Sequence, residues 1–323
     1  MKEEIRGVIM SAGRGTRMEP FSTFYPKPLL PVCNLPIMEH HINIMKGVGI
    51  REVVIVVGHL GFEIAKRMGD GSRFGIKIKY VEQKRNLGIA HAVGMLEPHI
   101  NGSFLLFLGD IFFISEDFER LIELKRERGS SAVLAVKEEN DPEAIKRNFT
   151  ILLDHDDRVK RVIEKPRYVT NMLKGCGIYL FDLHIFDAIR RTPRTAMRDE
   201  YELTEAIQIL IEDGFPVDIA KIIKTDINIT FPYDLLRCNL EELKVKKKDS
   251  LIDENVSLGG AEVINSVIGK NVDIKNPIKI SNSLIFPDTT LMVEYDIDSC
   301  IATPDDLLDC RRYIRYIVGK GGA

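Results

Sequence analysis

A loop of small residues follows the first apolar segment of the chain. Residues 11–17 read SAGRGTR, and Lys27 stands between two prolines a short distance later. Gly13 and Gly15 would let backbone N–H groups approach an anion, and the arginine that closes the loop adds a fork of donors that suits phosphate. The spacing is not the glycine fingerprint of dinucleotide-binding folds, because Met18 stands where the third glycine belongs, and the Gly-Lys-Ser/Thr ending of a P-loop is also missing. The loop therefore predicts a phosphate site of another kind.

A second candidate is the acid that ends a later apolar segment, SFLLFLGD, which closes on Asp110. Ligands of open α/β sheets bind beyond the carboxyl ends of the strands, so the loop and this carboxylate are expected in one crevice. Mg²⁺ takes one or two protein oxygens and completes its shell with phosphates and water. A nucleoside triphosphate with Mg²⁺ fits this set. Each motif alone also has a structural interpretation: a tight strand–helix turn for the loop, a surface lysine for Lys27 and a helix cap for Asp110.

Composition excludes several classes of protein. The 323 residues include 45 basic and 48 acidic side chains, so no overall positive field attracts nucleic acid. The N-terminus, MKEEIRGVIM, carries acids where a signal peptide needs basic residues, and no apolar run approaches membrane-spanning length. The five cysteines have no paired spacing for zinc or for disulfides. We expect a soluble, cytoplasmic protein without a nucleic-acid or membrane partner.

The elements that must position these residues alternate in the first half of the chain. Short apolar runs rich in Val, Ile and Phe, such as REVVIVVG and SFLLFLGD, are separated by helical stretches such as PIMEHHINIMKGVG. This alternation predicts a parallel sheet covered on both faces. From about residue 149 three strands follow one another with short turns, which favours antiparallel or mixed pairing.

The last part of the chain has a different period. After the basic stretch KVKKKD (residues 244–249), apolar residues recur at intervals of six, with Asn, Asp, Gly and Pro between them. Val272, Ile278 and Leu284 form one such series. Hexapeptide periodicity indicates a parallel β-helix, which we expect to serve assembly into a homo-oligomer. The final segment, TPDDLLDCRRYIRYIV, begins with Thr-Pro and acids, which predicts a helix.

Six ordered motifs, between residue 5 and about residue 240, resemble those of the sugar-phosphate nucleotidyltransferases, also called nucleotide-sugar pyrophosphorylases. They are GRGTRMEP with PKPLLP, YVEQKRNLGIAHAV, FLGD, IEKP, GCGIYLFD and RDEYELTEAIQILI. The last is similar to a segment of glucose-1-phosphate thymidylyltransferases, especially the long form with a β-helical tail. The resemblance implies an α/β fold with a Rossmann-like, mixed but mainly parallel sheet (the nucleotidyltransferase fold) and a short C-terminal left-handed parallel β-helix. It divides the chain into a catalytic domain (1–244), the β-helix (250–303) and a C-terminal helix (304–323).

The resemblance also implies an activity and a site. The enzyme would transfer a nucleotidyl group from an NTP, with dTTP or UTP favoured, to a sugar 1-phosphate, with Mg²⁺ as cofactor. Catalytic roles fall to Arg17, Lys27 and Asp110, and the residues that would bind nucleotide are Ala12, Gly13, Gly15, Thr16, Gln83 and Gly88. The amide of Gln83 would read the O4 and N3–H edge of uracil or thymine. The sugar phosphate would bind Glu164, Lys165, Gly177 and Arg198, and the metal would bind Asp110 and Asn228. No catalytic histidine is expected, because a sugar phosphate is already an anion near neutral pH; His59 and His91 are interpreted as structural.

Two positions depart from the family pattern. Phe149 stands where the thymidylyltransferases have a glycine, which suggests a different sugar or an altered pose. Asn228 stands where they have an aspartate, although some relatives use asparagine, and Asp226 is the alternative ligand. Two other functions stay open. One is a regulatory or scaffolding paralogue that binds nucleotide sugar without turnover, and the other adds an acetyltransferase in the tail. Retention of Arg17 and Lys27 argues against the first, and the shortness of the tail argues against the second.

Overall fold

A computed structural model of the chain describes residues 4–19, 21–195 and 199–312. The described residues form two compact units, one of residues 4–14 and 40–226 and the other of residues 15–39 and 227–312. This division differs from the expected boundary at residue 244, because the glycine loop from Gly15 onward belongs with the C-terminal part of the chain. Among the described residues, no helix has the length and apolar character needed to cross a membrane.

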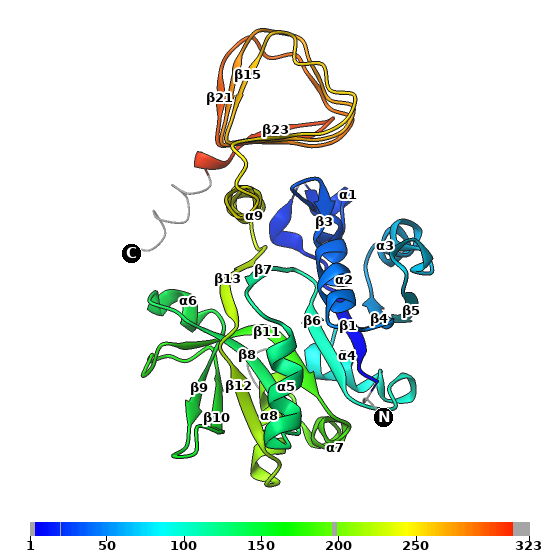
Figure 1. Ribbon diagram of the computed structural model, residues 1–323, viewed down its shortest axis with the longest axis vertical. Helices are drawn as coiled ribbons and strands as arrows, with labels where there is room; N and C mark the ends of the chain where they lie inside the picture. The colour runs from blue at the N-terminus through cyan, green and yellow to red at the C-terminus, as the bar shows by residue number, and fades with distance from the viewer. Residues whose placement is uncertain (1–3, 20, 196–198, 313–323) are drawn as a thin grey trace. The chain divides into compact units, whose positions relative to one another are not determined.

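The first unit is built on a nine-stranded sheet with the order β10-β9-β11-β6-β1-β4-β5, in which β8 pairs with β11 and β12 pairs with β8 (Figure 1). Its strands are β1 (Arg6–Ser11), β4 (Glu52–Val57), β5 (Lys77–Glu82), β6 (Phe104–Leu108), β8 (Ala132–Glu138), β9 (Phe149–Leu153), β10 (Val159–Glu164), β11 (Leu173–Phe181) and β12 (Val217–Ala220). β1 pairs in parallel with β4 and β6, β4 with β5, and β8 with β12. β11 runs antiparallel to β6, β8 and β9, as expected where the helical connections give way to short turns. The mixed, largely parallel sheet is therefore confirmed.

Helices connect these strands. They are α2 (Ile37–Gly47, of which residues 40–47 belong to this unit), α3 (Gly61–Met68), α4 (Ile89–Gly94), α5 (Glu119–Arg128), α6 (Pro142–Lys146), α7 (His184–Arg191) and α8 (Leu203–Glu212). Two further strands, β7 (Ile111–Ser115) and β13 (Ile223–Asn228), form a separate pair that the sequence patterns did not predict.

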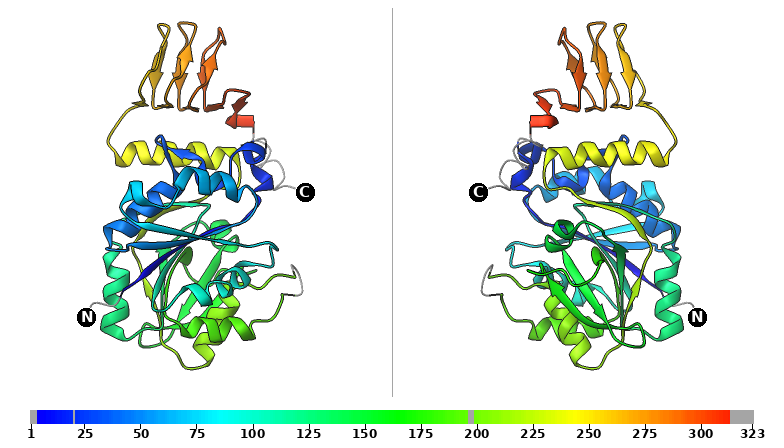
Figure 2. Two further views of the ribbon diagram at one scale, coloured as in Figure 1. Left: turned by 90° about the vertical axis from the view of Figure 1, so that its right-hand side faces the viewer. Right: turned by 90° about the vertical axis from the view of Figure 1, so that its left-hand side faces the viewer.

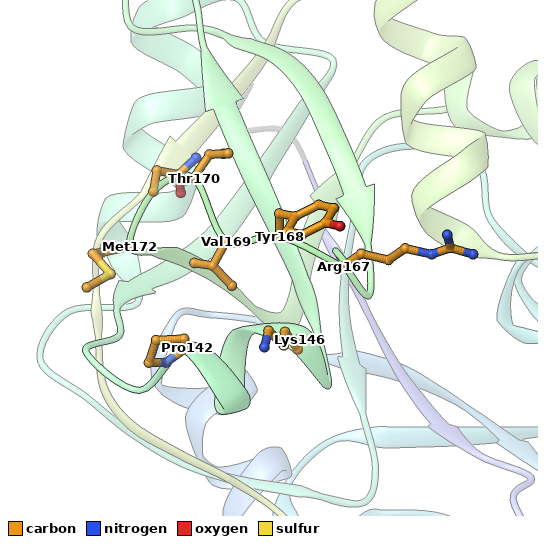
Figure 3. Close-up of a pocket in the computed structure, with 8 residues that line it drawn as sticks. Pro142, Lys146, Arg167, Tyr168, Val169, Thr170 and Met172 are labelled. Atoms are coloured by element: carbon orange, nitrogen blue, oxygen red, sulfur yellow. The ribbon is translucent and has the colours of Figure 1, made fainter.

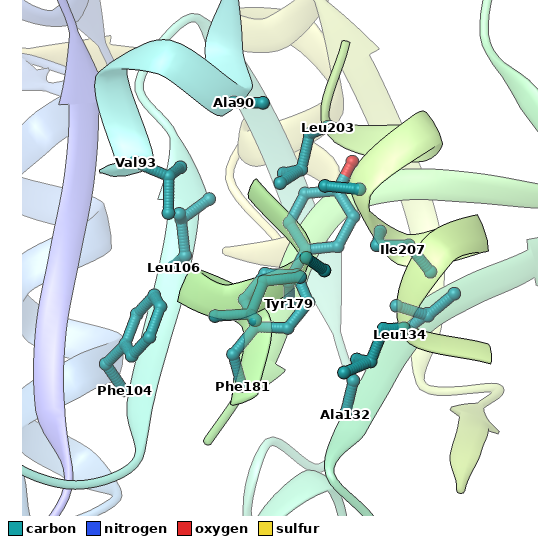
Figure 4. Close-up of a cluster of buried hydrophobic side chains, with 14 of the residues drawn as sticks. Ala90, Val93, Phe104, Leu106, Ala132, Leu134, Tyr179, Phe181, Leu203 and Ile207 are labelled. Carbon is teal, nitrogen blue, oxygen red and sulfur yellow. The ribbon is translucent and has the colours of Figure 1, made fainter. Parts of the chain in front are cut away.

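One face of the sheet carries the main hydrophobic core of this unit. Alternate residues of three neighbouring strands point into it, among them Phe104 and Leu106 of β6, and they meet Leu203 and Ile207 of α8 (Figure 4). Complete burial of such a side chain stabilises the fold by about 1.5–3 kcal/mol relative to leaving it in water. The central strands read as unbroken apolar runs because the face opposite this core is also buried, as Leu105 and Phe107 show.

The second unit combines an early and a late segment of the chain. The early segment contains the 3₁₀ turns η1 (Thr16–Met18) and η2 (Lys27–Leu29), α1 (Phe21–Phe24), β2 (Pro31–Val32) and β3 (Leu35–Pro36). It packs on α9 (Pro232–Val245), whose buried Asn239 accepts a hydrogen bond from the backbone N–H of Cys33 (2.8 Å) and donates one to the carbonyl oxygen of Pro31 (2.9 Å). Asp234 accepts from the backbone N–H groups of Thr230 and Phe231 and so caps the first turn of α9.

The tail, residues 250–309, consists of ten short strands. They are β14 (Leu251–Ile252), β15 (Glu262–Ile264), β16 (Val267–Ile268), β17 (Asp273–Ile274), β18 (Lys279–Ser281), β19 (Leu284–Ile285), β20 (Thr290–Leu291), β21 (Ile297–Asp298), β22 (Cys300–Ala302) and β23 (Leu307–Asp309). All but β23 pair in parallel with strands of neighbouring coils, and Figure 2 shows these coils side by side. Leu251 pairs with Val267, Val267 with Leu284 and Leu284 with Ile301, so one repeat spans 16 or 17 residues.

The expected helix over residues 304–323 is wrong in its first part. Leu307–Asp309 form β23, which runs antiparallel to β22 and pairs with Cys300–Ala302. The Thr-Pro start belongs to a hairpin turn, because Thr303 donates its N–H to the carbonyl oxygen of Asp306 (2.8 Å) and its hydroxyl accepts from the N–H of Asp306 (3.1 Å). A threonine followed by acids suits either a helix cap or such a turn, and here pairing with β22 selects the turn. Residues 313–323 of the expected helix lie outside the described residues.

Candidate active site

The segment expected to read the base forms a compact cluster in the first unit. Gln83, directly after β5, is buried, and its Nε2 donates to the carbonyl oxygen of Gly88 (3.5 Å) and to Nδ1 of His91 (3.3 Å). Gly88 has φ of 103°, and a Cβ there would lie 2.5 Å from the carbonyl oxygen of Tyr201. Only glycine fits this position without strain. The structure thus brings Gln83 and Gly88 together, and His91 and Tyr201 belong to the same cluster.

His91 and Tyr201 have roles that the sequence analysis did not assign. Tyr201 donates its N–H to the carbonyl oxygen of Leu87 (2.8 Å), and its ring lies near that of His91, with centroids 6.3 Å apart. Because Nδ1 of His91 accepts from Gln83, the amide nitrogen of Gln83 is occupied and its oxygen is left for a ligand. The spacing of eight residues between Gln83 and His91, across one turn into α4, was the available signal.

Asp110 stands at the carboxyl end of β6 between two tightly packed neighbours. A Cβ on Gly109 would lie 2.5 Å from Oγ of Ser11 at the end of β1, so the backbones of the two strands approach closely there. The carbonyl oxygen of Ile111 accepts a hydrogen bond from Nε2 of His41, 2.8 Å away. Burial lowers the pKa of His41 to about 3, so this imidazole is neutral and acts as a fixed donor. Asp110 therefore sits on a rigid backbone at the sheet edge where ligands of such folds bind.

The oxygen atoms near Asp110 suit a metal ion that takes most of its ligands from substrate and water. Among the described residues, no three His, Cys, Asp or Glu side chains converge on one point as a preformed metal site would. The buried hydroxyl of Ser11 has no hydrogen-bond partner in the described part of the chain and lies beside Gly109. One carboxylate with a nearby hydroxyl fits Mg²⁺, which takes few protein ligands and keeps phosphates and water in its shell.

Glu164 ends β10 and Lys165 follows it with a strained backbone. Lys165 has φ of 43° and precedes a proline, a combination that is disfavoured for any side chain. Its N–H donates to the carbonyl oxygen of Asn148 (2.7 Å), and its Nζ lies 3.5 Å from Oε1 of Glu164. Oε2 of Glu164 accepts from the hydroxyl of Thr204 on α8 (3.2 Å). Strain of this kind is typical of functional sites, and here it presents both side chains at the end of the strand.

Gly177 lies in the irregular part of β11, where the pairing with β8 shifts register between Gly175 and Tyr179. It has φ of 69°, and a Cβ there would lie 2.5 Å from Cδ1 of Ile111, the residue after Asp110. The structure thus brings Gly177 next to the Asp110 segment. Arg198, the remaining residue of the expected sugar site, lies outside the described residues.

Phe149, the first departure from the family pattern, is buried in the core and is the Cα partner of Glu164 in the β9–β10 pair. Its ring stacks on Tyr179, with centroids 6.1 Å apart and planes at 15°. A Cβ on Gly175 would lie 1.9 Å from Cζ of Phe149, so the ring occupies the space that a side chain at Gly175 would take. The phenyl ring and this glycine therefore form a matched pair beside Glu164.

Asp226, the alternative metal ligand, is engaged elsewhere in the first unit. Its carboxylate lies 2.7 Å from Nζ of Lys174 and 3.3 Å from Nζ of Lys137, and its side chain is only 3% exposed. Glu139 completes the group at 2.8 Å from Lys137. Burial lowers the pKa of Lys137, but the ion pairs with Glu139 and Asp226 outweigh it and raise that pKa overall. Asn228, two residues further along β13, is exposed and belongs to the second unit.

The phosphate-loop residues are divided between the units. Ala12 and Gly13 belong to the first unit, where Ala12 packs under Gly58, whose Cβ would lie 2.6 Å from the Ala12 carbonyl oxygen. Gly15, Thr16, Arg17 and Lys27 belong to the second unit. Gly15 has φ of 67°, and a Cβ there would lie 2.7 Å from Cε of Lys27, so the lysine stem lies across the loop. Open space surrounds Gly13, which gives no steric reason for a glycine there.

A pocket that sequence reasoning missed lies beyond the Lys165 end of β10. It has a volume of about 530 Å³ and is formed by α6 and residues 167–172 (Figure 3). Tyr168, Val169 and Met172 line it opposite Pro142 and Lys146. Its volume lies in the range of small-molecule sites, and its walls are mainly apolar.

Comparison with known proteins agrees with these observations. Residues 6–223 match the sequence profile of the family described as nucleotidyl transferase. The chain is 33% identical to the low-salt glycan biosynthesis nucleotidyltransferase Agl11 of Haloferax volcanii, covering 81% of this chain and 73% of that protein. It is 32% identical to a glucose-1-phosphate thymidylyltransferase of Streptomyces griseus, covering 89% and 82%. A putative glucose-1-phosphate thymidylyltransferase from Bacillus anthracis, solved in complex with sucrose, superposes with a TM-score of 0.65 at 25% identity, covering 73% of this chain and 94% of that one. The chain therefore belongs to the nucleotidyl transferase family.

Proposed function

We propose that the protein transfers a nucleotidyl group from dTTP or UTP to a sugar 1-phosphate. An oxygen of the sugar phosphate attacks the α-phosphorus, the bond from that phosphorus to the bridging oxygen breaks, and pyrophosphate leaves with the electron pair. The observation that carries the proposal is the joint placement of Gln83 with Gly88, of Asp110 with Gly177, and of Glu164 with Lys165 in one sheet-based unit. Relatives named as thymidylyltransferases support the same class of reaction.

The reaction needs electrostatic stabilisation rather than covalent or general-base catalysis by a side chain. Both substrates are anions, so the main barrier is their mutual repulsion, and fixed cations lower it. Arg17 and Lys27 would bind the triphosphate, and Lys165 would bind the phosphate of the acceptor. Asp110 and Asn228 are the proposed ligands of Mg²⁺, which when bound supplies positive charge to the phosphates. No side chain needs to remove a proton from the acceptor.

The orientation of Gln83 supports a pyrimidine with an N–H at position 3. Since the amide nitrogen donates to Gly88 and His91, the amide oxygen faces the ligand as an acceptor. Uracil and thymine present N3–H, a donor, whereas cytosine presents an acceptor at N3. We therefore propose dTTP or UTP over CTP.

The tail and the assembly are the remaining parts of the proposal. The parallel pairing at 16- or 17-residue intervals and the three-sided outline of the tail seen end-on support a β-helix over residues 250–303 (Figure 1). We propose the left-handed form, as the resemblance implies, in a cytoplasmic homo-oligomer.

The test is a matrix of dTTP, UTP, CTP, ATP and GTP against a panel of sugar 1-phosphates, measured by pyrophosphate release. Turnover that requires both substrates and is fastest with dTTP or UTP is expected. Nucleotide binding without pyrophosphate release in any combination would favour a regulatory paralogue. A tenfold preference for ATP or GTP would show that the base assignment to Gln83 is wrong.

A further inference from the structure

The tail contacts the segment that carries Lys27. The ring of Phe286, directly after β19, stacks on that of Phe21 in α1, with centroids 5.9 Å apart and planes at 21°. Tyr25 meets the same ring edge-on at 5.5 Å. Further along, Asn34 donates from Nδ2 to the carbonyl oxygen of Ile268 in β16, 3.0 Å away. These contacts join residues more than 230 positions apart and lie wholly within the second unit.

Phe286 faces out of the tail rather than into it. The hydrophobic cluster that fills the tail includes Ile285, but Phe286 is not a member of it. Even so, Phe286 is only 2% exposed, which its contacts with Phe21 and Tyr25 explain. Burial, followed by the nearby carboxylates of Asp305 and Asp288, raises the pKa of Tyr25 and keeps its hydroxyl neutral. A large aromatic side chain placed on the outside of a coil and covered by α1 has no evident task within the coil itself.

The segment between these contacts and Lys27 is short and conformationally restricted. Tyr25 donates its N–H to the carbonyl oxygen of Phe21 (2.8 Å), and Pro26 fixes the backbone before Lys27. Lys27 opens η2, and its stem lies across Gly15, as the 2.7 Å approach of its Cε to the Cβ position of Gly15 shows. A shift of Tyr25 would therefore move Lys27 and the loop beneath it together.

We propose that Phe286, with the backbone of Ile268, positions Lys27 and the loop of residues 15–18 for phosphate binding, so that the tail is part of the catalytic machinery. Phe286 is a positioning residue, since it acts on substrate only through Lys27. The inference rests on the proposed function of Lys27, but the contacts themselves do not. The tail thus has a task inside one chain, in addition to any role in assembly.

The experiment compares Phe286→Ala with Ile280→Ala in the full-length protein. Ile280 is completely buried in the cluster that fills the tail, so its loss weakens the coil without removing the contact with α1. Hydrogen exchange of the backbone amides of residues 15–39 is measured first, because it does not depend on activity. Faster exchange in Phe286→Ala than in Ile280→Ala is expected, with Phe286→Leu in between. Equal exchange in both alanine variants would overturn the proposal.

Steady-state kinetics then separate positioning from general destabilisation. We expect Phe286→Ala to lower kcat at least tenfold at temperatures well below its unfolding transition, and Ile280→Ala to lower it less than twofold. In a Lys27→Ala background the same Phe286→Ala change should have little further effect, because both act through one group. Full additivity of the two changes would overturn the proposal. If the wild-type protein releases no pyrophosphate with any substrate pair, the proposed function fails, and the exchange result still decides whether the tail orders this loop.

Discussion

The ammonium group of Lys174 lies 2.7 Å from a carboxylate oxygen of Asp226, and neither side chain is more than 5% exposed. Lys137 adds a second cation at 3.3 Å from the same carboxylate. Asp226 and Glu139 together balance the charges of Lys174 and Lys137, so this buried carboxylate belongs to a structural group. This pairing argues against Asp226 as a metal ligand and in favour of Asn228.

Replacement of Asp226 by alanine should therefore act on stability. It leaves Lys174, whose side chain is only 5% exposed, without its nearest carboxylate, which costs about 3–5 kcal/mol for a broken buried pair. Urea unfolding measures the loss of free energy of unfolding. The Mg²⁺ concentration that gives half the maximal rate of the folded protein should be unchanged. The double variant Asp226→Asn/Lys174→Met should recover part of the stability. An increase of tenfold or more in the Mg²⁺ requirement of Asp226→Ala would show that Asp226 holds the metal.

Loss of Asp110 should affect the reaction itself. We expect Asp110→Ala to lower kcat/KM about a thousandfold or more, equivalent to roughly 4 kcal/mol of transition-state stabilisation, because it is the charged ligand of the proposed metal site. Asn228→Asp should keep activity and lower the Mg²⁺ concentration for half-maximal rate, since it adds an anionic ligand. Steady-state rates across a Mg²⁺ series check both. An Asn228→Asp variant with a raised requirement would count against this ligand assignment.

His41 should make stability depend on pH. Its folded pKa, about 3, is below the ordinary value near 6.5, so the unfolded chain binds more protons between these values and stability falls as the pH drops below 6.5. Between pH 7.5 and pH 5 this single group should cost about 2 kcal/mol. His41→Gln keeps an N–H donor for Ile111 but does not titrate, so its loss over the same interval should be smaller by that amount.

Denaturant unfolding at both pH values measures this difference. His155, whose side chain is 88% exposed, supplies the control, because His155→Gln makes the same substitution at a surface position. An equal loss on acidification in His41→Gln and wild type would contradict the assignment.

Phe149 should restrict the acceptor sugar. Its ring occupies the space beside Gly175, and its backbone pairs with Glu164, so we expect a bulky substituent on a sugar bound at Glu164 to be excluded. Phe149→Ala should raise kcat/KM for N-acetylglucosamine 1-phosphate relative to glucose 1-phosphate about tenfold, a typical gain from reshaping an apolar pocket. Phe181→Ala, which removes another buried ring that stacks on Tyr179, should not change this ratio. The same change in both variants would mean that core loosening, and not Phe149, sets the preference.

His91 should increase the preference of the enzyme for dTTP over CTP. His91→Ala removes one of the two acceptors of the Gln83 amide nitrogen and leaves only the longer contact with Gly88, so the amide can turn and present a donor to N3 of cytosine. We expect the ratio of kcat/KM for CTP to that for dTTP to rise about tenfold, with the affinity for sugar 1-phosphate unchanged. His59→Ala is the comparison, because His59 lies in a turn of the first unit and, in the part of the chain that the structure describes, makes no hydrogen bond with Gln83. A fall in the rate with every NTP by one common factor would assign His91 a purely structural role.

The sequence by itself determined the family, the class of reaction and the order of most of the elements in the first unit. Apolar runs such as SFLLFLGD became central strands, and the helical stretches became the helices that connect them, because hydrophobic periodicity is a local property. The motifs around Gln83, Asp110 and Glu164 placed the chain in its family, since a few side chains at fixed distances along the chain carry the binding chemistry. Gly88 stands in one of these motifs, but the reason that only glycine fits there, the approach of the Tyr201 backbone, is seen only in the folded chain.

Only the tertiary structure decided which distant segments meet. No local pattern predicts that Cys33 bonds to Asn239, that Phe286 covers Phe21, or that Lys174 neutralises Asp226. The strand at Leu307–Asp309 makes the same point, because the turn at Thr303 and a helix cap have the same residue preferences, and pairing with β22 settled the outcome. Such contacts depend on chain closure and register over hundreds of residues, and the free energy that selects them comes from burial and hydrogen bonding that exist only in the folded state.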